Sequence, residues 1–234
     1  MGGALAKGAM AAGVLKPSQV VAFDSDPRVR AGFKKLGVVA AAHPLDVVQK
    51  AALIFLCVKP QNMKEAVLPL ALQAAPSALR KKCFVSIAAG IPLRRLESWL
   101  GEGVPVFRVM PNTPALLGAG MAAVSRGRFG TGTQEKQVLR ILSSVGQAVV
   151  VSERWMDAVT AVSGSGPAYV FYLAEAMIAG AERLGVGAEL ARTLVHQTIY
   201  GAGQMLARIA EPAQELRRQV TSPGGTTAAA VTVF

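Results

Sequence analysis

The chain has 234 residues, enough for one large domain or two small ones. Its 52% hydrophobic and 17% charged residues exclude a disordered chain, which cannot bury enough apolar surface to fold. The longest clean apolar run, residues 51–58, is too short to cross a membrane, because a spanning helix needs roughly 18 or more such residues.

The net charge of +11 comes from 25 basic and 14 acidic side chains. These basic residues are scattered in short pairs, without a tail or an aromatic-rich stripe, so we expect no nucleic-acid partner but attraction of small anions. Cys57 and Cys83 lie in apolar runs without a CxxC spacing, and the two histidines are far apart. We therefore predict no metal site, and free buried thiols in the reducing cytoplasm.

Segments typical of strands and helices alternate through the first two thirds of the chain. An amphipathic helix is predicted within residues 1–15, with no strand before it. Strands are predicted at residues 19–23, 37–41, 53–58, 84–88, 104–110, 121–124 and 148–151. Helices are predicted between them at residues 27–36, 45–50, 63–75, 92–100 and 133–142. This alternation predicts an α/β fold with a Rossmann-like, doubly wound, mostly parallel sheet.

The pattern becomes helical after residue 152. A helix opening at residue 157 is interrupted by a Ser-Gly repeat. Two long helices are expected at 167–184 and 188–209, and a shorter one at 213–220. We therefore predict two domains, a dinucleotide-binding domain at residues 1–152 and an all-helical dimerisation and substrate domain at residues 153–234.

Three consecutive strands end in turns made of small residues or prolines: LCVKP at 56–60, IAAG at 87–90 and RVMPNTP at 108–114. Ligands of open α/β sheets bind outside the carboxyl ends of the strands. Each turn alone is equally consistent with a simple tight turn, but together they predict the binding edge for a flat cofactor. Gly2 and Gly3 are typical of the end of a dinucleotide-binding glycine turn.

Two further motifs combine glycines with hydroxyl groups: SGSGPAY at 163–169 and VTSPGGTT at 220–227. Backbone N–H groups in such turns can hold a carboxylate. The alternative interpretation is helix capping by serine, threonine and glycine.

In this order, the five motifs resemble those of the pyrroline-5-carboxylate reductase family, and the resemblance covers nearly the whole chain. It implies an NAD(P)H-dependent oxidoreductase that reduces the cyclic imine L-1-pyrroline-5-carboxylate to L-proline in proline biosynthesis, in homo-oligomers formed through the helical domain. The chain departs from the family pattern at both ends, lacking its first strand and its last helices. This predicts a truncated chain that binds cofactor poorly.

The resemblance also implies roles for individual residues. Thr227 matches the position of the donor to the imine nitrogen. The implied substrate-binding residues are Val220, Ser222, Gly224, Gly225 and Thr226. The implied cofactor-binding residues are Gly2, Ser25, Pro27, Cys57, Val58, Lys59, Pro60, Ala88, Ala89, Gly90, Met110, Pro111, Asn112 and Thr113.

The choice between NADH and NADPH stays open. Asp24 follows a strand, where an acid can bond the ribose 2′-hydroxyl of NADH, whereas Arg28 and Arg30 can hold the 2′-phosphate of NADPH. Two other functions also remain: another dehydrogenase of the same architecture that acts on a hydroxy acid or a prephenate-like substrate, and an inactive remnant that only oligomerises.

Overall fold

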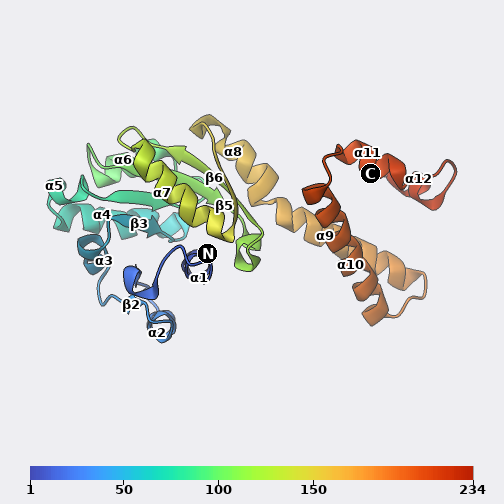
Figure 1. Cartoon of the computed structure of the whole chain (residues 1–234), viewed down its shortest axis with the longest axis horizontal. Coiled ribbons are helices and arrows are strands. Elements are labelled where there is room, and N and C mark those ends of the chain that lie inside the picture. The colour runs from blue at the N-terminus through green and yellow to red at the C-terminus, as the bar shows by residue number, and fades with distance from the viewer. Residues whose placement is uncertain (234) are drawn as a thin grey trace. The chain divides into compact units, whose positions relative to one another are not determined.

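A computed structural model describes residues 1–233. The chain divides into two compact units, Met1–Pro167 and Ala168–Phe234. The first unit contains all the strands of the described chain, and the second is helical (Figure 1). The predicted succession of a Rossmann-like α/β part and a helical part is therefore confirmed.

The strands of the first unit form two separate sheets. The larger sheet runs in the order β3 (Leu53–Leu56), β4 (Cys83–Ser86), β5 (Val106–Pro111), β6 (Gly120–Arg126) and β7 (Gly146–Val150). All its neighbours are parallel except β5 and β6, which are antiparallel. The smaller sheet pairs β1 (Val21–Ala22) with β2 (Val39–Ala40) in parallel. A mostly parallel arrangement is confirmed, but no hydrogen-bonded ladder joins β1 to β3 within the described residues.

The helices of the first unit connect these strands. They are α1 (Gly2–Ala11), α2 (Pro27–Lys35), α3 (Pro44–Lys50), α4 (Met63–Gln73), α5 (Pro76–Leu79), α6 (Leu93–Leu100), α7 (Gly132–Leu142) and α8 (Met156–Val159). Several begin with residues suited to a helix start. Asp26 accepts a hydrogen bond from the backbone N–H of Arg28 at the start of α2, and Thr131 with Gln134 forms a capping box at α7.

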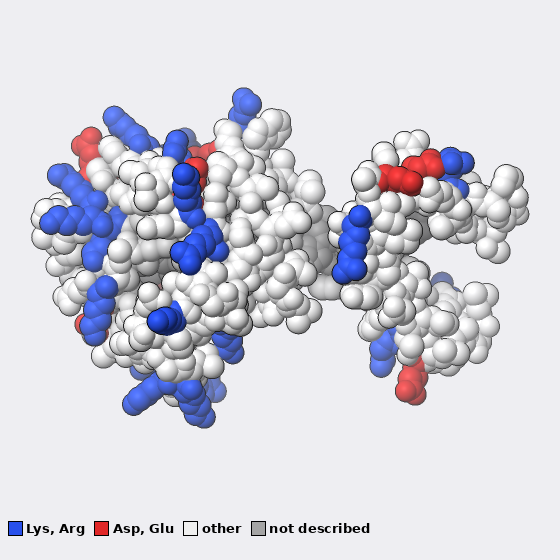
Figure 2. Space-filling model, in the orientation of Figure 1, with Lys and Arg blue, Asp and Glu red and all other residues white. Residues whose placement is uncertain are grey.

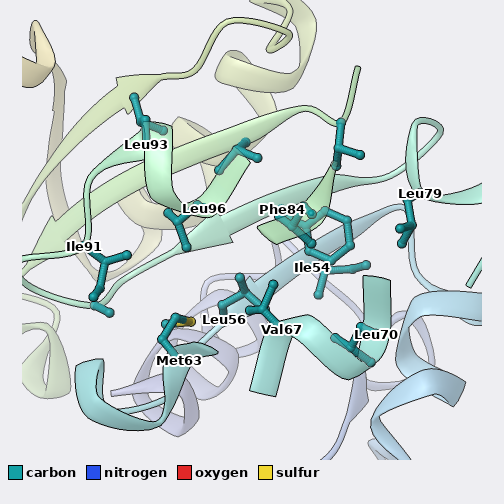
Figure 3. Packing of buried hydrophobic residues seen from close by; sticks show 14 of the residues in the cluster. Ile54, Leu56, Met63, Val67, Leu70, Leu79, Phe84, Ile91, Leu93 and Leu96 are labelled. Atoms are coloured by element: carbon teal, nitrogen blue, oxygen red, sulfur yellow. The ribbon is translucent and has the colours of Figure 1, made fainter. Parts of the chain in front are cut away.

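The central strands of the larger sheet bury side chains on both faces. Every residue of β4 is buried, and Cys83, Phe84 and Val85 alternate between two apolar clusters. Phe84 packs with Leu56, with Val67 of α4 and with Leu96 of α6 on one face (Figure 3). Val85 belongs to the cluster on the other face, which also includes residues of α1 and α7. This two-sided burial explains why the strands read as continuous apolar runs.

The second unit is built from α9 (Gly166–Arg183), which begins at the end of the first unit, α10 (Ala188–Arg208), α11 (Ala213–Gln219) and α12 (Thr226–Val231). It has a small interior: Ala191, Val195 and Leu216 are its only buried hydrophobic residues among those described. The 18-residue α9 contains no buried residue at all. No helix of residues 1–233 is long and apolar enough to span a bilayer.

Basic side chains are spread over the surface rather than gathered in one patch. Figure 2 shows them as separate groups on the first unit, with a few acidic side chains between them. This distribution agrees with the scatter of lysines and arginines along the sequence. It leaves no continuous basic surface on the face shown.

Candidate functional site

The three motif turns of the first unit lie at one edge of the larger sheet. β3, β4 and β5 are parallel neighbours, with Leu56 opposite Ser86 and Ser86 opposite Arg108. Their carboxyl ends therefore lead side by side into residues 57–60, 87–90 and 110–113. The structure thus brings together most of the residues expected to hold the cofactor, as the parallel topology requires.

Gly2 joins this edge because it packs directly against the end of β3. A Cβ atom placed on Gly2 would lie 2.8 Å from Cβ and 2.9 Å from Sγ of Cys57, so only glycine allows this approach. Cys57 as a residue is exposed, but its sulfur lies against this first turn of α1. The surrounding protein displaces water from the thiol and raises its pKa to about 11, so the thiol stays neutral.

The turn after β4 leaves open space for a flat ligand. Ala88 is buried, and its backbone N–H donates to Oγ of Ser86 over 3.3 Å, which shapes the turn. Gly90 has φ of +72°, a conformation that favours glycine, and a Cβ placed on it would meet no atom within 4 Å. Small side chains with free space beside them allow a ligand to approach this turn closely.

The turn after β5 contacts the Ser-Gly motif. The Asn112 amide accepts a hydrogen bond from the N–H of Met121 over 2.8 Å and donates one to the carbonyl of Ser163 over 3.0 Å. Gly164 packs against the side chain of Met110. Two motifs that lie far apart in the sequence thus meet at the carboxyl end of β5.

Ser25 lies in the segment that follows β1 of the smaller sheet, and Pro27 begins α2. Asp24 accepts a hydrogen bond from the N–H of Asp26 over 2.9 Å. Arg28 pairs with Asp26 over 2.9 Å, which lowers the pKa of this carboxyl, and Arg30 donates to the carbonyl of Asp24 over 2.5 Å. Both arginines thus have local partners. No ladder links this segment to the other cofactor turns among the described residues.

The expected substrate residues form a tight turn in the second unit, between α11 and α12. Pro223 and Gly224 occupy the centre of this turn, the N–H of Gly225 donates to the carbonyl of Ser222 over 3.1 Å, and Gly224 has φ of +70°. Proline followed by a glycine of positive φ defines a type II turn. Thr226 and Thr227 then begin α12, and Thr227 is half-buried.

Ion pairs of a buried arginine in β5 were not predicted from the sequence. Arg108 lies in the middle of β5 with only 7% of its side chain exposed. Its guanidinium is 3.3 Å from Glu153 and 3.6 Å from Asp157. Glu153 also accepts the N–H of Leu93 over 2.7 Å, and so caps α6 from 60 residues away. An arginine within an apolar strand was the available signal, because a buried charge needs a partner.

A separate hollow of about 620 Å³ lies between α6, the end of β6 and the end of β7. Arg94, Arg126 and Arg128 line it together with Glu97 and Glu135, and Arg126 approaches Glu135 to 3.9 Å. None of the expected cofactor or substrate residues borders it. No cluster of potential metal ligands occurs within residues 1–233.

Comparisons with known families match both parts of the chain. Residues 153–234 match the family described as pyrroline-5-carboxylate reductase dimerisation. Residues 1–90 match the family described as NADP oxidoreductase, coenzyme F420-dependent.

Individual relatives agree with these matches. Pyrroline-5-carboxylate reductase of Pseudomonas aeruginosa is 45% identical over 90% of this chain and 77% of its own length. The enzyme of Pisum sativum is 37% identical over 99% of this chain and 83% of its own. The structure of Plasmodium falciparum pyrroline carboxylate reductase with NADP bound has a TM-score of 0.87 at 30% identity, over 100% of this chain and 85% of that one.

Proposed function

The chain belongs to the pyrroline-5-carboxylate reductase family, and we propose that it reduces the C=N bond of L-1-pyrroline-5-carboxylate to give L-proline, with NADPH or NADH as reductant. In this reaction a hydride from the reduced cofactor adds to the imine carbon, the electron pair of the C=N π bond moves to the nitrogen, and the nitrogen takes up one proton from solvent. The observation that carries the assignment is the identity with named reductases along almost the entire chain. A hydroxy-acid or prephenate dehydrogenase is not favoured by these relatives.

We propose that the carboxyl ends of β3, β4 and β5 hold the cofactor. The residues assigned to it are Gly2, Ser25, Pro27, Cys57, Val58, Lys59, Pro60, Ala88, Ala89, Gly90, Met110, Pro111, Asn112 and Thr113. The small turn at Ala88 to Gly90, with open space beside it, suits the ring, and Lys59 places a positive charge near the phosphates. NAD(P)H supplies the hydride when bound, and the protein supplies position and electrostatics.

The turn that precedes α12 is proposed to hold the substrate. Backbone N–H groups of Gly224, Gly225 and Thr226 and the Ser222 hydroxyl are donors suited to the carboxylate, and Val220 provides an apolar side. The Thr227 hydroxyl is the proposed donor to the imine nitrogen. As hydride adds to the carbon, negative charge develops on the imine nitrogen, which becomes a better hydrogen-bond acceptor. The hydrogen bond from Thr227 therefore strengthens as the transition state is approached.

The helical unit is proposed to join copies of this chain. We assign residues 1–152 to cofactor binding and residues 153–234 to dimerisation and substrate binding, in line with the family match. Exposed aromatic side chains on α9 support an obligate interface: Tyr169 is 59%, Phe171 60% and Tyr172 74% exposed. The free thiols Cys57 and Cys83 are typical of a reducing compartment, and we propose the cytoplasm.

The assignment is tested by following NADPH and NADH oxidation with pyrroline-5-carboxylate as the substrate. We expect turnover with the imine and the reduced cofactor. We expect no turnover when a hydroxy acid or prephenate is supplied with the oxidised cofactor. Turnover of a hydroxy acid together with none of the imine would overturn the assignment. Comparing the two reduced cofactors in the same assay also settles the preference between them.

A further inference from the structure

The side chain of Asn112 joins three segments of the first unit. It follows β5 directly, its Oδ1 accepts the N–H of Met121 at the start of β6 over 2.8 Å, and its Nδ2 donates to the carbonyl of Ser163 over 3.0 Å. The amide thus uses its oxygen and its nitrogen within the protein. This leaves its side chain poorly suited to serve as a direct ligand of the cofactor.

The carbonyl of Ser163 needs such a donor from outside its own helix. In a regular helix it would accept the N–H of residue 167, but that residue is Pro167, which has no N–H. The Asn112 amide supplies a donor to this carbonyl over 3.0 Å. The turn that carries it, Thr160–Gly164, is π-helical, and the N–H of Ser165 closes it by donating to the carbonyl of Thr160 over 2.8 Å. Turns of this kind are rare and occur frequently at functional sites.

A second contact holds the same turn in place. Gly164 packs so closely on Met110 that a Cβ atom at Gly164 would collide with the end of the methionine side chain. Met110 is one of the residues assigned to the cofactor edge. The π-helical turn is therefore fixed against the end of β5 at two adjacent points, Asn112 with Ser163 and Met110 with Gly164.

We propose that Asn112 is a positioning residue for the reduction: its amide holds the turn Thr160–Gly164 against the end of β5 and so sets the wall beside the nicotinamide. This inference rests on the proposed function and reassigns the side chain of Asn112 from cofactor binding to positioning. A displaced wall misplaces the imine relative to the hydride donor, and a misplacement of about 1 Å can cost on the order of 100-fold in rate.

The test uses the full chain with Asn112→Asp. The carboxylate still accepts the N–H of Met121 but faces the Ser163 carbonyl with an oxygen instead of a donor. We expect kcat/KM for the imine to fall about 10- to 100-fold, mostly in kcat, with the Kd for NADPH within about twofold of wild type by fluorescence titration. A tenfold weaker NADPH affinity would make Asn112 a direct cofactor ligand and overturn the proposal.

A second measurement does not depend on the reaction. Amide hydrogen exchange, read by mass spectrometry, should rise in Asn112→Asp across residues 160–165 more than elsewhere in the first unit. Gln73→Glu makes the same chemical change at an exposed position of α4 and should leave exchange in this segment unchanged. If exchange at residues 160–165 does not rise, Asn112 does not hold the turn, whatever the substrate.

Gly164→Ala covers the case in which Asn112→Asp fails to fold. It perturbs the second, adjacent contact of the same turn, the one with Met110, and the flexible end of Met110 can move to admit the methyl group. We expect the same pattern, with lower kcat/KM and retained NADPH affinity. Unchanged kcat/KM in Gly164→Ala, together with raised exchange at residues 160–165, would show that the turn does not position the substrate and would overturn the proposal.

Discussion

Replacing Glu153 with alanine should destabilise the first unit by removing two interactions at once. The Glu153 carboxylate accepts the N–H of Leu93 at the start of α6 over 2.7 Å, and it pairs with Arg108 over 3.3 Å. Loss of a helix cap typically costs about 1 kcal/mol. Removal of one partner from a buried ion pair costs about 3–5 kcal/mol, because the remaining charge stays buried.

The structure reduces the second contribution. The Glu153 side chain is 35% exposed, and Asp157 remains 3.6 Å from the Arg108 guanidinium after the substitution. We therefore expect a total loss of about 2–4 kcal/mol in the free energy of unfolding. For a chain of this size, each kcal/mol lowers the unfolding midpoint by about 2–4 °C, so Tm should fall by roughly 5–15 °C.

Thermal unfolding followed by near-ultraviolet circular dichroism measures this change. Glu153→Gln keeps a carbonyl oxygen that can accept the Leu93 N–H but loses the charge, so its Tm should lie between those of wild type and Glu153→Ala. Glu102→Ala removes an exposed carboxylate for which no partner is found among the described residues, and serves as the matched control. A Tm for Glu153→Ala equal to that of the control would refute the coupling of α6 to β5.

Three further outcomes are expected. Thr227→Ala should lower kcat/KM for the imine about 30- to 1,000-fold and leave the NADPH affinity unchanged, because a transition-state hydrogen bond contributes about 2–4 kcal/mol. An unchanged rate would leave the hydroxyl with a structural role only. Burial raises the pKa of the Cys83 thiol to about 12, so iodoacetamide at neutral pH should label this thiol only in urea, and labelling in the native state would contradict its burial. Because the thiol of the unfolded chain ionises more easily, the free energy of unfolding should fall as pH rises above about 8.5. Light scattering should give a mass that is a multiple of 24.3 kDa, and a monomer at micromolar concentration would contradict the proposed role of α9.

Much of the larger sheet follows from the sequence, because strands buried on both faces must be apolar throughout. Residues 53–56 and 83–86 form such strands, each close to its predicted position. The antiparallel pairing of β5 with β6 was not expected, although the sequence contains the signal. Only residues 112–119 separate the two strands, and a parallel crossover needs a dozen or more residues, usually including a helix.

The split into two sheets is harder to foresee. β1 and β2 have only two residues each, and their pairing depends on what lies beside them rather than on their own residues. The turn before α12, by contrast, could have been derived in full. Proline followed by two glycines specifies a type II turn, and Gly224 has the positive φ that the third position of this turn requires.

Two long-range polar contacts could not be predicted from the sequence. Asn112 bonds a carbonyl 51 residues away, and Glu153 caps a helix that begins 60 residues before it. Such partners are set by the fold, whereas the motifs are read from local runs of glycine, proline and serine. The motifs mark where the backbone turns. The Asn112 substitution should therefore loosen the turn Thr160–Gly164, and the Glu153 substitution should loosen the start of α6, while the motif turns themselves remain.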